Sequence, residues 1–207
     1  GYGRGEMAPY SDIDLMFLLP YKLTPHSEQV VEFVLYMLWD LGLKVGHATR
    51  SIDEAMRLAT DDISTRTSML DTRCLYGNQS LAKKFNKRFS EEIVKKTGPL
   101  FVEAKLAERD RRHVRMGDTR YVLEPNLKEG KGGLRDLQTL FWLAKYLYGA
   151  DNALGLKEAN VLTTSDVRTF AKAENFLWSV RCNLHYIAGR PEERLTFNVQ
   201  EELGRRM

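Results

Sequence analysis

Two aspartates near the start of the chain are the residues whose type and spacing point most clearly to chemistry. Asp12 and Asp14 are separated by one apolar residue and open an apolar run at positions 15–19. Side chains alternate across a β-strand, so a strand here would direct both carboxylates to one face. Adjacent carboxylates repel each other unless a cation lies between them, and Mg²⁺ takes few carboxylates together with substrate phosphate oxygens. The pair therefore predicts a magnesium site that acts on a phosphate compound.

A glycine-rich segment precedes the aspartates and could bring a phosphate to them. Gly1, Gly3 and Gly5 allow backbone N–H groups to approach a phosphate closely, and Arg4 could add a charged fork. Taken alone, an Asp-x-Asp pair more often lies in a solvated turn, and a glycine turn is weak evidence. The combination favours metal-assisted transfer at a nucleoside triphosphate, because these aspartates open a very apolar strand.

The elements that must position these residues form a small α/β part at the N-terminal end. Strand patterns cover residues 12–19 and 43–50, with a helical apolar spacing between them at 27–41. Ser27 is the expected cap of that helix. Ser51 is expected to cap the next one, with a glutamate at the capping-box position.

Helical patterns dominate the rest of the chain. Residues 63–76 are expected to form a helix that runs into a short extended piece at 73–76. Later helical patterns cover 79–96, 100–116, 134–148 and 165–189. The sequence thus predicts an α+β fold, with a small mixed-sheet module at residues 1–78 and a mostly helical domain at residues 79–207.

Composition excludes several classes of protein. The 207 residues are 43% hydrophobic and 29% charged, which is typical of a globular chain. Cys74 and Cys182 are too few for a disulfide scaffold or a cysteine zinc cluster, and both are expected to be small buried side chains. No apolar run approaches the roughly 20 residues of a membrane helix, and no signal peptide is visible. We therefore expect a cytoplasmic protein with no membrane partner.

The net charge of +3 conceals a gradient along the chain. Residues 1–82 hold 7 Lys/Arg against 11 Asp/Glu, whereas residues 83–120 hold 12 against 6. No run of five or more like charges occurs, so nucleic acid is not an expected partner. The basic segment 83–120 is expected to be a solvated helix face. The alternatives are that it supports an anionic nucleotide or docks an acceptor protein.

The sequence of the first 15 residues resembles that of a known family. The stretch GYGRGEMAPYSDIDL resembles the opening of the PII uridylyltransferases, the bifunctional nitrogen-sensor enzymes. Its glycine turn and Asp-x-Asp are similar to those of nucleotidyltransferases related to DNA polymerase β. Three further stretches match, namely VGHATR at 45–50, LEPNLK at 123–128 and GGLRDL at 132–137. The resemblance covers nearly the whole chain.

This resemblance implies a polymerase β-like nucleotidyltransferase module with a defined activity. The enzyme would transfer UMP from UTP to a tyrosine hydroxyl of the PII signalling protein and release pyrophosphate. Asp12 and Asp14 match the metal-binding pair, which would hold two Mg²⁺ ions. The turn that faces the triphosphate would contain Gly1, Gly3, Arg4, Gly5 and Ser11.

The resemblance also implies parts that lie outside these 207 residues. The family usually has a further glycine and a strand before Gly1, so we expect the module at 1–78 to be truncated at its N-terminus. The family's full chain continues into an HD-type phosphohydrolase domain that removes UMP and two ACT domains that sense glutamine. The superfamily often adds a third carboxylate. Asp71 is the first candidate for it and Asp62 the second, although each suits a capping or surface position.

Other assignments stay open from the sequence alone. The nucleotide or acceptor could differ, as in protein adenylylation or small-molecule modification, or the chain could be a catalytically silent helical interaction module. His47 lies in one of the matching stretches, but a hydrogen-bonded structural histidine is the simpler interpretation. Lys128 and Arg135 could face the nucleotide or the acceptor protein.

Overall fold

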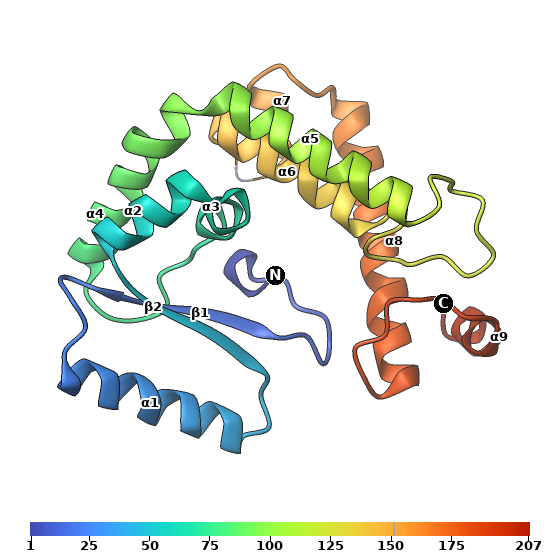
Figure 1. Ribbon diagram of the computed structural model, residues 1–207. Helices are drawn as coiled ribbons and strands as arrows, with labels where there is room; N and C mark the ends of the chain where they lie inside the picture. Colours follow the sequence, from blue (N-terminus) through green and yellow to red (C-terminus); the bar gives the residue numbers. More distant parts are fainter. Residues whose placement is uncertain (151) are drawn as a thin grey trace. The chain divides into compact units, whose positions relative to one another are not determined.

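The chain folds into two compact units, seen in a computed structural model that describes residues 1–150 and 152–207 (Figure 1). The first unit contains residues 1–7 and 11–97, and the second contains residues 8–10 and 98–207. Helices predominate, and one two-stranded sheet lies in the first unit. This composition agrees with the predicted α+β class. No helix in the described ranges is both long and apolar enough to cross a membrane.

A parallel pair of strands forms the sheet of the first unit. β1 (Ile13–Leu19) pairs with β2 (Val45–Ser51), and α1 (Pro25–Asp40) connects them. In Figure 1, α1 lies on one side of the sheet, and α2 (Ile52–Asp61) and α3 (Ile63–Leu70) lie on the other. The described sheet contains parallel pairing only, so the mixed sheet of the prediction is not present among the described residues.

The start of α1 corrects one sequence prediction. Thr24, not Ser27, is the N-cap, because the Thr24 hydroxyl accepts a hydrogen bond from the Ser27 N–H at 3.2 Å. The Ser27 hydroxyl in turn accepts from the Thr24 N–H at 2.9 Å. Ser27 is therefore the third helical residue of a capping box, and Pro25 occupies the first helical turn, where its missing N–H costs nothing.

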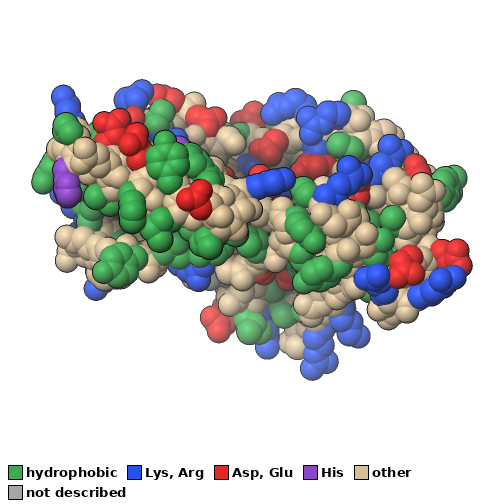
Figure 2. All heavy atoms as spheres, turned by 90° about the horizontal axis from the view of Figure 1, so that it is seen from below, with side chains coloured by type: hydrophobic (Ala, Val, Ile, Leu, Met, Phe, Trp, Pro, Cys, Tyr) green, Lys and Arg blue, Asp and Glu red, His purple; other side chains and the backbone are tan. Residues whose placement is uncertain are grey.

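The outward face of α1 is unusually apolar. Large hydrophobic side chains are exposed along it, among them Val30, Phe33, Tyr36 and Met37. Figure 2 shows hydrophobic side chains gathered at the left of the view, where α1 lies. A surface helix normally turns polar residues outward, so this face departs from the usual amphipathic pattern.

The rest of the first unit packs around α2. Ser51 caps this helix as predicted, because its hydroxyl accepts a hydrogen bond from the Glu54 N–H at 3.3 Å. α4 (Gln79–Arg88) continues through a π-helical turn (Phe89–Ile93) into a 3₁₀ turn (Val94–Lys96). The rings of Phe85 and Phe89 stack with their centroids 6.1 Å apart. The core of this unit includes Ala55, Met56, Ala59, Phe85 and Ile93.

The second unit contains five described helices. They are α5 (Gly98–Arg115), α6 (Leu134–Tyr148), α7 (Ala153–Glu158), α8 (Thr164–Ala188) and α9 (Phe197–Arg206). Gly149 and Gly189 end α6 and α8 in left-handed conformations, as the predicted helix ends require. The core of this unit includes a cluster of Leu127, Val180, Leu184 and Leu203, and a second of Ala144, Ala150 and Leu156.

The limits of the units differ from the predicted boundary near residue 78. Residues 79–97 belong to the first unit, so the chain passes into the second unit at Gly98. The helical spacing at 79–96 resembles that of the later helices, and nothing in its local pattern tells which core it joins. The predicted domain limits themselves stay a prediction. Cys74 is exposed, so the prediction that it is a buried side chain is wrong, and Cys182 is half-buried.

Candidate functional site

The carboxylate pair lies at the start of β1. Asp14 belongs to the strand, Asp12 immediately precedes it, and both side chains are exposed. The Ile13 N–H donates to the Lys44 carbonyl oxygen at 2.8 Å, which fixes the backbone between the two aspartates. The predicted strand is confirmed from Ile13 to Leu19, so it contains Asp14 but not Asp12.

A glycine on the neighbouring strand leaves space for one of these carboxylates. Gly46 lies opposite Asp14 in the parallel register. A Cβ atom built on Gly46 would lie 2.8 Å from Oδ1 of Asp14, closer than ordinary contacts allow. The Asp14 carboxylate thus rests over the bare backbone of β2. The sequence alone did not indicate this close approach of Gly46 to Asp14.

The glycine turn is held against the end of α3. Its centre is a 3₁₀ turn, Tyr2–Arg4, and Gly5 follows in a left-handed conformation with φ 77°. A Cβ atom on Gly3 would lie 1.9 Å from the backbone oxygen of Asp71, so only glycine allows this approach. The Arg4 guanidinium donates to the Asp71 carboxylate, and both side chains are largely buried.

A second arginine ties the turn to the segment after α3. The Arg73 guanidinium donates to the Tyr2 carbonyl oxygen at 3.1 Å and lies 5.3 Å from the centroid of the Tyr2 ring. Within the turn, the N–H groups of Arg4 and Gly5 each donate to a backbone carbonyl at 3.0 Å. These two N–H groups are already used, so the exposed donors of the turn must lie elsewhere.

The structure brings some of the predicted site residues together and leaves others apart. Gly1, Gly3, Arg4 and Gly5 form one turn, and half-buried Ser11 directly precedes Asp12. Within residues 1–150 and 152–207, no three His, Cys, Asp or Glu side chains form a group that could hold a metal ion.

The two candidates for a third carboxylate have other partners. Asp71 is bound to Arg4, and no described group joins it to Asp12 and Asp14. Asp62 caps α3, because its carboxylate accepts from the Thr65 N–H at 2.6 Å. These hydrogen bonds from Thr65 lower the pKa of Asp62. The third-carboxylate role stays a prediction for both residues, and their observed contacts are with the glycine turn and with a helix end.

His47 lies on the other face of the sheet from the carboxylates. It is opposite Leu15 in the register, one position along from the Asp14–Gly46 pair. Its ring meets the edge of Trp39 on α1 with centroids 6.4 Å apart. His47 therefore contacts the side of the sheet that packs α1, which favours its structural interpretation.

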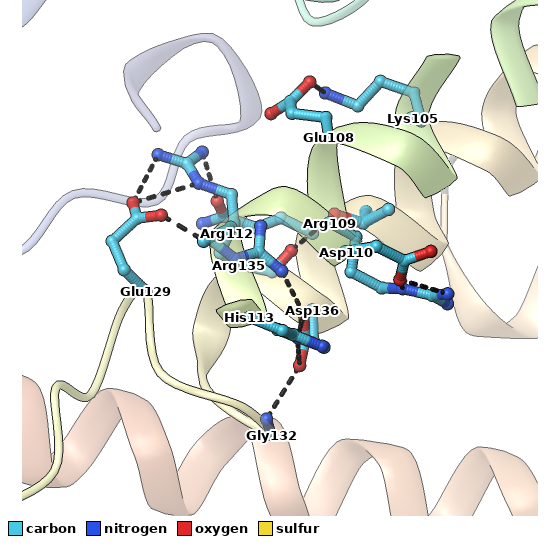
Figure 3. A network of polar contacts seen from close by, with 12 residues as sticks. Lys105, Glu108, Arg109, Asp110, Arg112, His113, Glu129, Gly132, Arg135 and Asp136 are labelled. Carbon is cyan, nitrogen blue, oxygen red and sulfur yellow. Dashed lines mark hydrogen bonds and ion pairs between the residues drawn. The ribbon is translucent and has the colours of Figure 1, made fainter. Parts of the chain in front are cut away.

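A second polar cluster lies within the second unit, where α5 faces the start of α6 (Figure 3). Its centre is Asp136, whose carboxylate accepts hydrogen bonds from Arg112 and from the Gly132 N–H, the latter at 2.7 Å. Nε2 of His113 lies 2.9 Å from the same carboxylate. One aspartate thus joins α5, α6 and the glycine-rich loop between them.

The remaining members of this cluster include basic side chains that pair with acidic ones. Arg135 donates to Glu129 at 3.2 Å and to Gln138 at 2.9 Å, so its guanidinium is engaged within the cluster. Lys105 is 2% exposed, lies 2.6 Å from Glu108, and sits over the Trp142 ring at 4.4 Å. Burial lowers the pKa of Lys105, and the neighbouring Glu108 partly opposes that shift.

An open pocket of about 660 Å³ lies beside this cluster. It is lined by both polar and apolar side chains, including Leu106, His113, Arg120, Lys131, Asp136 and Leu143. The Lys131 ammonium lies 2.8 Å from the Asp118 carboxylate at the pocket and lowers the pKa of that carboxyl. The partner of His113, Asp136, is 23 residues away, and no local sequence pattern links the two.

Several known proteins are similar to this chain in sequence. The sequence model of the GlnD PII-uridylyltransferase family matches residues 100–207. Three curated relatives align over all 207 residues, and each is named a bifunctional uridylyltransferase/uridylyl-removing enzyme. They come from Azospirillum brasilense (60% identical), Rhodospirillum rubrum (61%) and Phenylobacterium zucineum (56%).

The alignments cover all of this chain but only a small part of each relative. The 207 residues span 22% of the length of each of these three relatives. No solved structure matches the chain. The family assignment therefore rests on the sequence, and the family model covers more than half of it. The chain belongs to the GlnD PII-uridylyltransferase family.

Proposed function

We propose that this chain carries the site that transfers UMP from UTP to a tyrosine hydroxyl of the PII signalling protein. The observation that carries the proposal is the pair Asp12 and Asp14 at the start of an apolar strand, with Gly46 leaving room for one carboxylate. Membership of the uridylyltransferase family supports the choice of nucleotide and acceptor.

The donor set suits a hard divalent cation. Two exposed carboxylates on one side of a strand offer oxygen ligands, and Mg²⁺ completes its shell with water and substrate phosphate oxygens. A Cβ atom on Gly46 would crowd the Asp14 carboxylate, so glycine leaves room for it there. A bound Mg²⁺ would lower the pKa of the attacking hydroxyl and neutralise charge on the leaving pyrophosphate.

The glycine turn would hold the triphosphate. Arg4 is the charged donor of this turn, and its salt bridge to Asp71 fixes the guanidinium in one orientation. Because Arg4 carries five N–H donors, it can bind Asp71 and still offer donors to a phosphate. In this proposal Asp71 positions the turn through Arg4 and through the close contact with Gly3.

The acceptor protein would approach the open side of the carboxylate pair. The side chains of this chain would then align the tyrosine hydroxyl with the α-phosphate, and positioning and electrostatics would supply most of the rate. The net positive segment 83–120 is our candidate for docking the acceptor.

The test is transfer of label from α-labelled UTP to purified PII in the presence of Mg²⁺. The expected result is labelled PII with the wild type and none with the variant Asp12→Asn plus Asp14→Asn. The matched control, Asp40→Asn plus Asp61→Asn, changes two exposed carboxylates elsewhere in the first unit and should label PII normally. Labelling from ATP instead of UTP would indicate a different nucleotide. Equal labelling by both double variants would refute the site.

A further inference from the structure

The open pocket of the second unit is a candidate binding site that the proposed transfer reaction does not use. Its volume is about 660 Å³, a size typical of small-molecule sites. Its lining residues come from α5, from α6 and from the segment between them, and all belong to the second unit. The site therefore lies entirely within one folded unit.

Two of the carboxylates that line the pocket are paired with cations of the same lining. Nε of Arg109 donates to the Asp110 carboxylate at 2.9 Å, and the Lys131 ammonium donates to Asp118 at 2.8 Å. The hydrogen bond from Lys131 holds the pKa of Asp118 below its ordinary value, so this carboxylate is ionised and paired at neutral pH. Both acids are thus offset by charges at the pocket itself.

A third carboxylate, that of Asp136, is satisfied from behind the pocket. It accepts hydrogen bonds from the Arg112 guanidinium and from the Gly132 N–H, and Nε2 of His113 lies 2.9 Å from it (Figure 3). Arg112 is 4% exposed and is not among the residues that line the pocket. Its charge therefore comes in addition to those of the lining.

Positive charge exceeds negative charge around this pocket. With His113 counted as neutral, the three carboxylates face four cations, namely Arg109, Arg112, Arg120 and Lys131. Arg120 is the lining cation that has no hydrogen bond or ion pair within residues 1–150 and 152–207. A guanidinium presents its N–H donors in a planar fork, which matches a carboxylate in shape and charge. The surplus of about one positive charge fits a ligand with one negative charge.

Apolar side chains form much of the remaining wall. Leu106 and Val114 on α5 belong to it, as do Leu140 and Leu143 on α6. Val114 is 71% exposed and Leu140 is 39% exposed, so a ligand with an apolar body would remove part of this surface from water. An inorganic anion would gain nothing from that wall. A nucleoside triphosphate would bring several negative charges to a surplus of about one.

We propose that this pocket binds a small organic monocarboxylate with an apolar body. The carboxylate would lie on Arg120, and the apolar body would pack against the leucines of α5 and α6. A bound ligand would join the segment before α6 to both helices. The inference goes beyond the proposed UMP transfer, because it uses none of the residues assigned there to the metal and the triphosphate.

The test is isothermal titration calorimetry of the full-length protein with 3-phenylpropanoate as the probe. We expect saturable binding. The neutral amide of the probe should bind about 10-fold more weakly or worse, because it loses a charged hydrogen-bonded pair. Acetate keeps the charge but lacks the apolar body, so it should also bind at least about 10-fold more weakly. Affinity for the amide or for acetate equal to that for the probe would overturn the proposal.

The variant Arg120→Gln tests whether the probe binds in this pocket. Arg120 is exposed and has no described partner, so the variant should keep the wild-type Tm while its Kd for the probe rises about 10-fold. The matched control, Arg168→Gln, changes an exposed arginine of α8 outside the pocket lining and should alter neither quantity. Unchanged affinity in Arg120→Gln, or no saturable binding to the wild type, would overturn the proposal.

The variant Asp12→Asn plus Asp14→Asn distinguishes this inference from the proposed function. It should bind the probe with wild-type affinity although it transfers no UMP, and UTP with Mg²⁺ should not displace the probe from it. Displacement by UTP in this variant would assign the pocket to a nucleotide and overturn the monocarboxylate. A wild type that binds the probe but transfers no UMP would refute the proposed function and leave this inference supported.

Discussion

The substitution Gly46→Ala should separate activity from stability. Gly46 lies opposite Asp14 on the neighbouring strand, and the added Cβ would lie 2.8 Å from Oδ1 of that aspartate. The atom in the way is the far end of a flexible side chain, so the carboxylate can rotate aside without moving the strand. The φ angle of Gly46 lies outside the left-handed region, so alanine can adopt this backbone.

The size of the effect follows from this distance. An ordinary carbon–oxygen contact is about 3.5 Å, so the carboxylate must retreat by roughly 0.7 Å. Catalytic groups tolerate about 0.5 Å of displacement, and about 1 Å can cost 100-fold in rate. We therefore expect kcat/KM to fall by about 10-fold to 100-fold, which corresponds to about 1.4 to 2.7 kcal/mol of transition-state stabilisation. The free energy of unfolding should hold or rise by up to about 1 kcal/mol, because alanine restricts the unfolded chain.

Steady-state UMP transfer and thermal unfolding measure the two quantities on the same preparation. Gly204→Ala on α9 is the matched control, because a Cβ there meets nothing within 4 Å. It should leave kcat/KM unchanged and raise Tm slightly. If Gly46→Ala retained full activity, the placement of the Asp14 carboxylate over β2 would not matter for catalysis, and the reasoning would fail.

Two further predictions concern the elements that support the site. Gly3→Ala places a Cβ 1.9 Å from the backbone oxygen of Asp71, which cannot rotate away, so Tm and affinity for UTP should both fall. Gly204→Ala, which also meets nothing within 4 Å and lies outside this turn, should lower neither quantity in calorimetry. Asp62→Ala removes the cap of α3 and should cost about 1 kcal/mol of unfolding free energy at pH 7, whereas Asp62→Asn should cost less. Hydrogen bonds from Thr65 lower the pKa of Asp62 in the fold, so this contribution is present above its unfolded pKa of about 3.9 and is lost as pH falls further. Denaturant titrations should show the difference between wild type and Asp62→Ala shrinking below about pH 4, and a constant difference would contradict the capping role.

Local sequence signals predicted those helices and strands whose extent is marked by residues within or next to them. The strand at 12–19 has an apolar run, and the helix at 134–148 ends at a glycine with φ 66°. The N-cap at Thr24 was missed because both Thr24 and Ser27 are residues that cap helices. They form hydrogen bonds with each other, and the sequence does not tell which of the two is the N-cap. α7 and α9 were missed because they are short and form no long apolar stripe, so their stability depends on tertiary packing.

The same distinction applies to the candidate site. Asp12 and Asp14 could be placed on one face from the period of a strand alone. The close approaches of Gly46 to Asp14 and of Gly3 to Asp71 depend on the register of β1 with β2 and on the end of α3, which are long-range features. The pairing of His113 with Asp136 across 23 residues is likewise a tertiary contact with no local signal.

The central claim is that Asp12 and Asp14 bind a metal–nucleotide complex. The most direct measurement is the Tm of the protein with Mg²⁺ and UTP, compared with Mg²⁺ alone, for wild type and for Asp12→Asn plus Asp14→Asn. A ligand that binds only the folded state stabilises it by mass action, about 2.7 kcal/mol at 100 times its Kd. The account predicts a rise in Tm for the wild type that disappears in the double variant. The same rise in both proteins, or no rise in the wild type at saturating UTP, would contradict it.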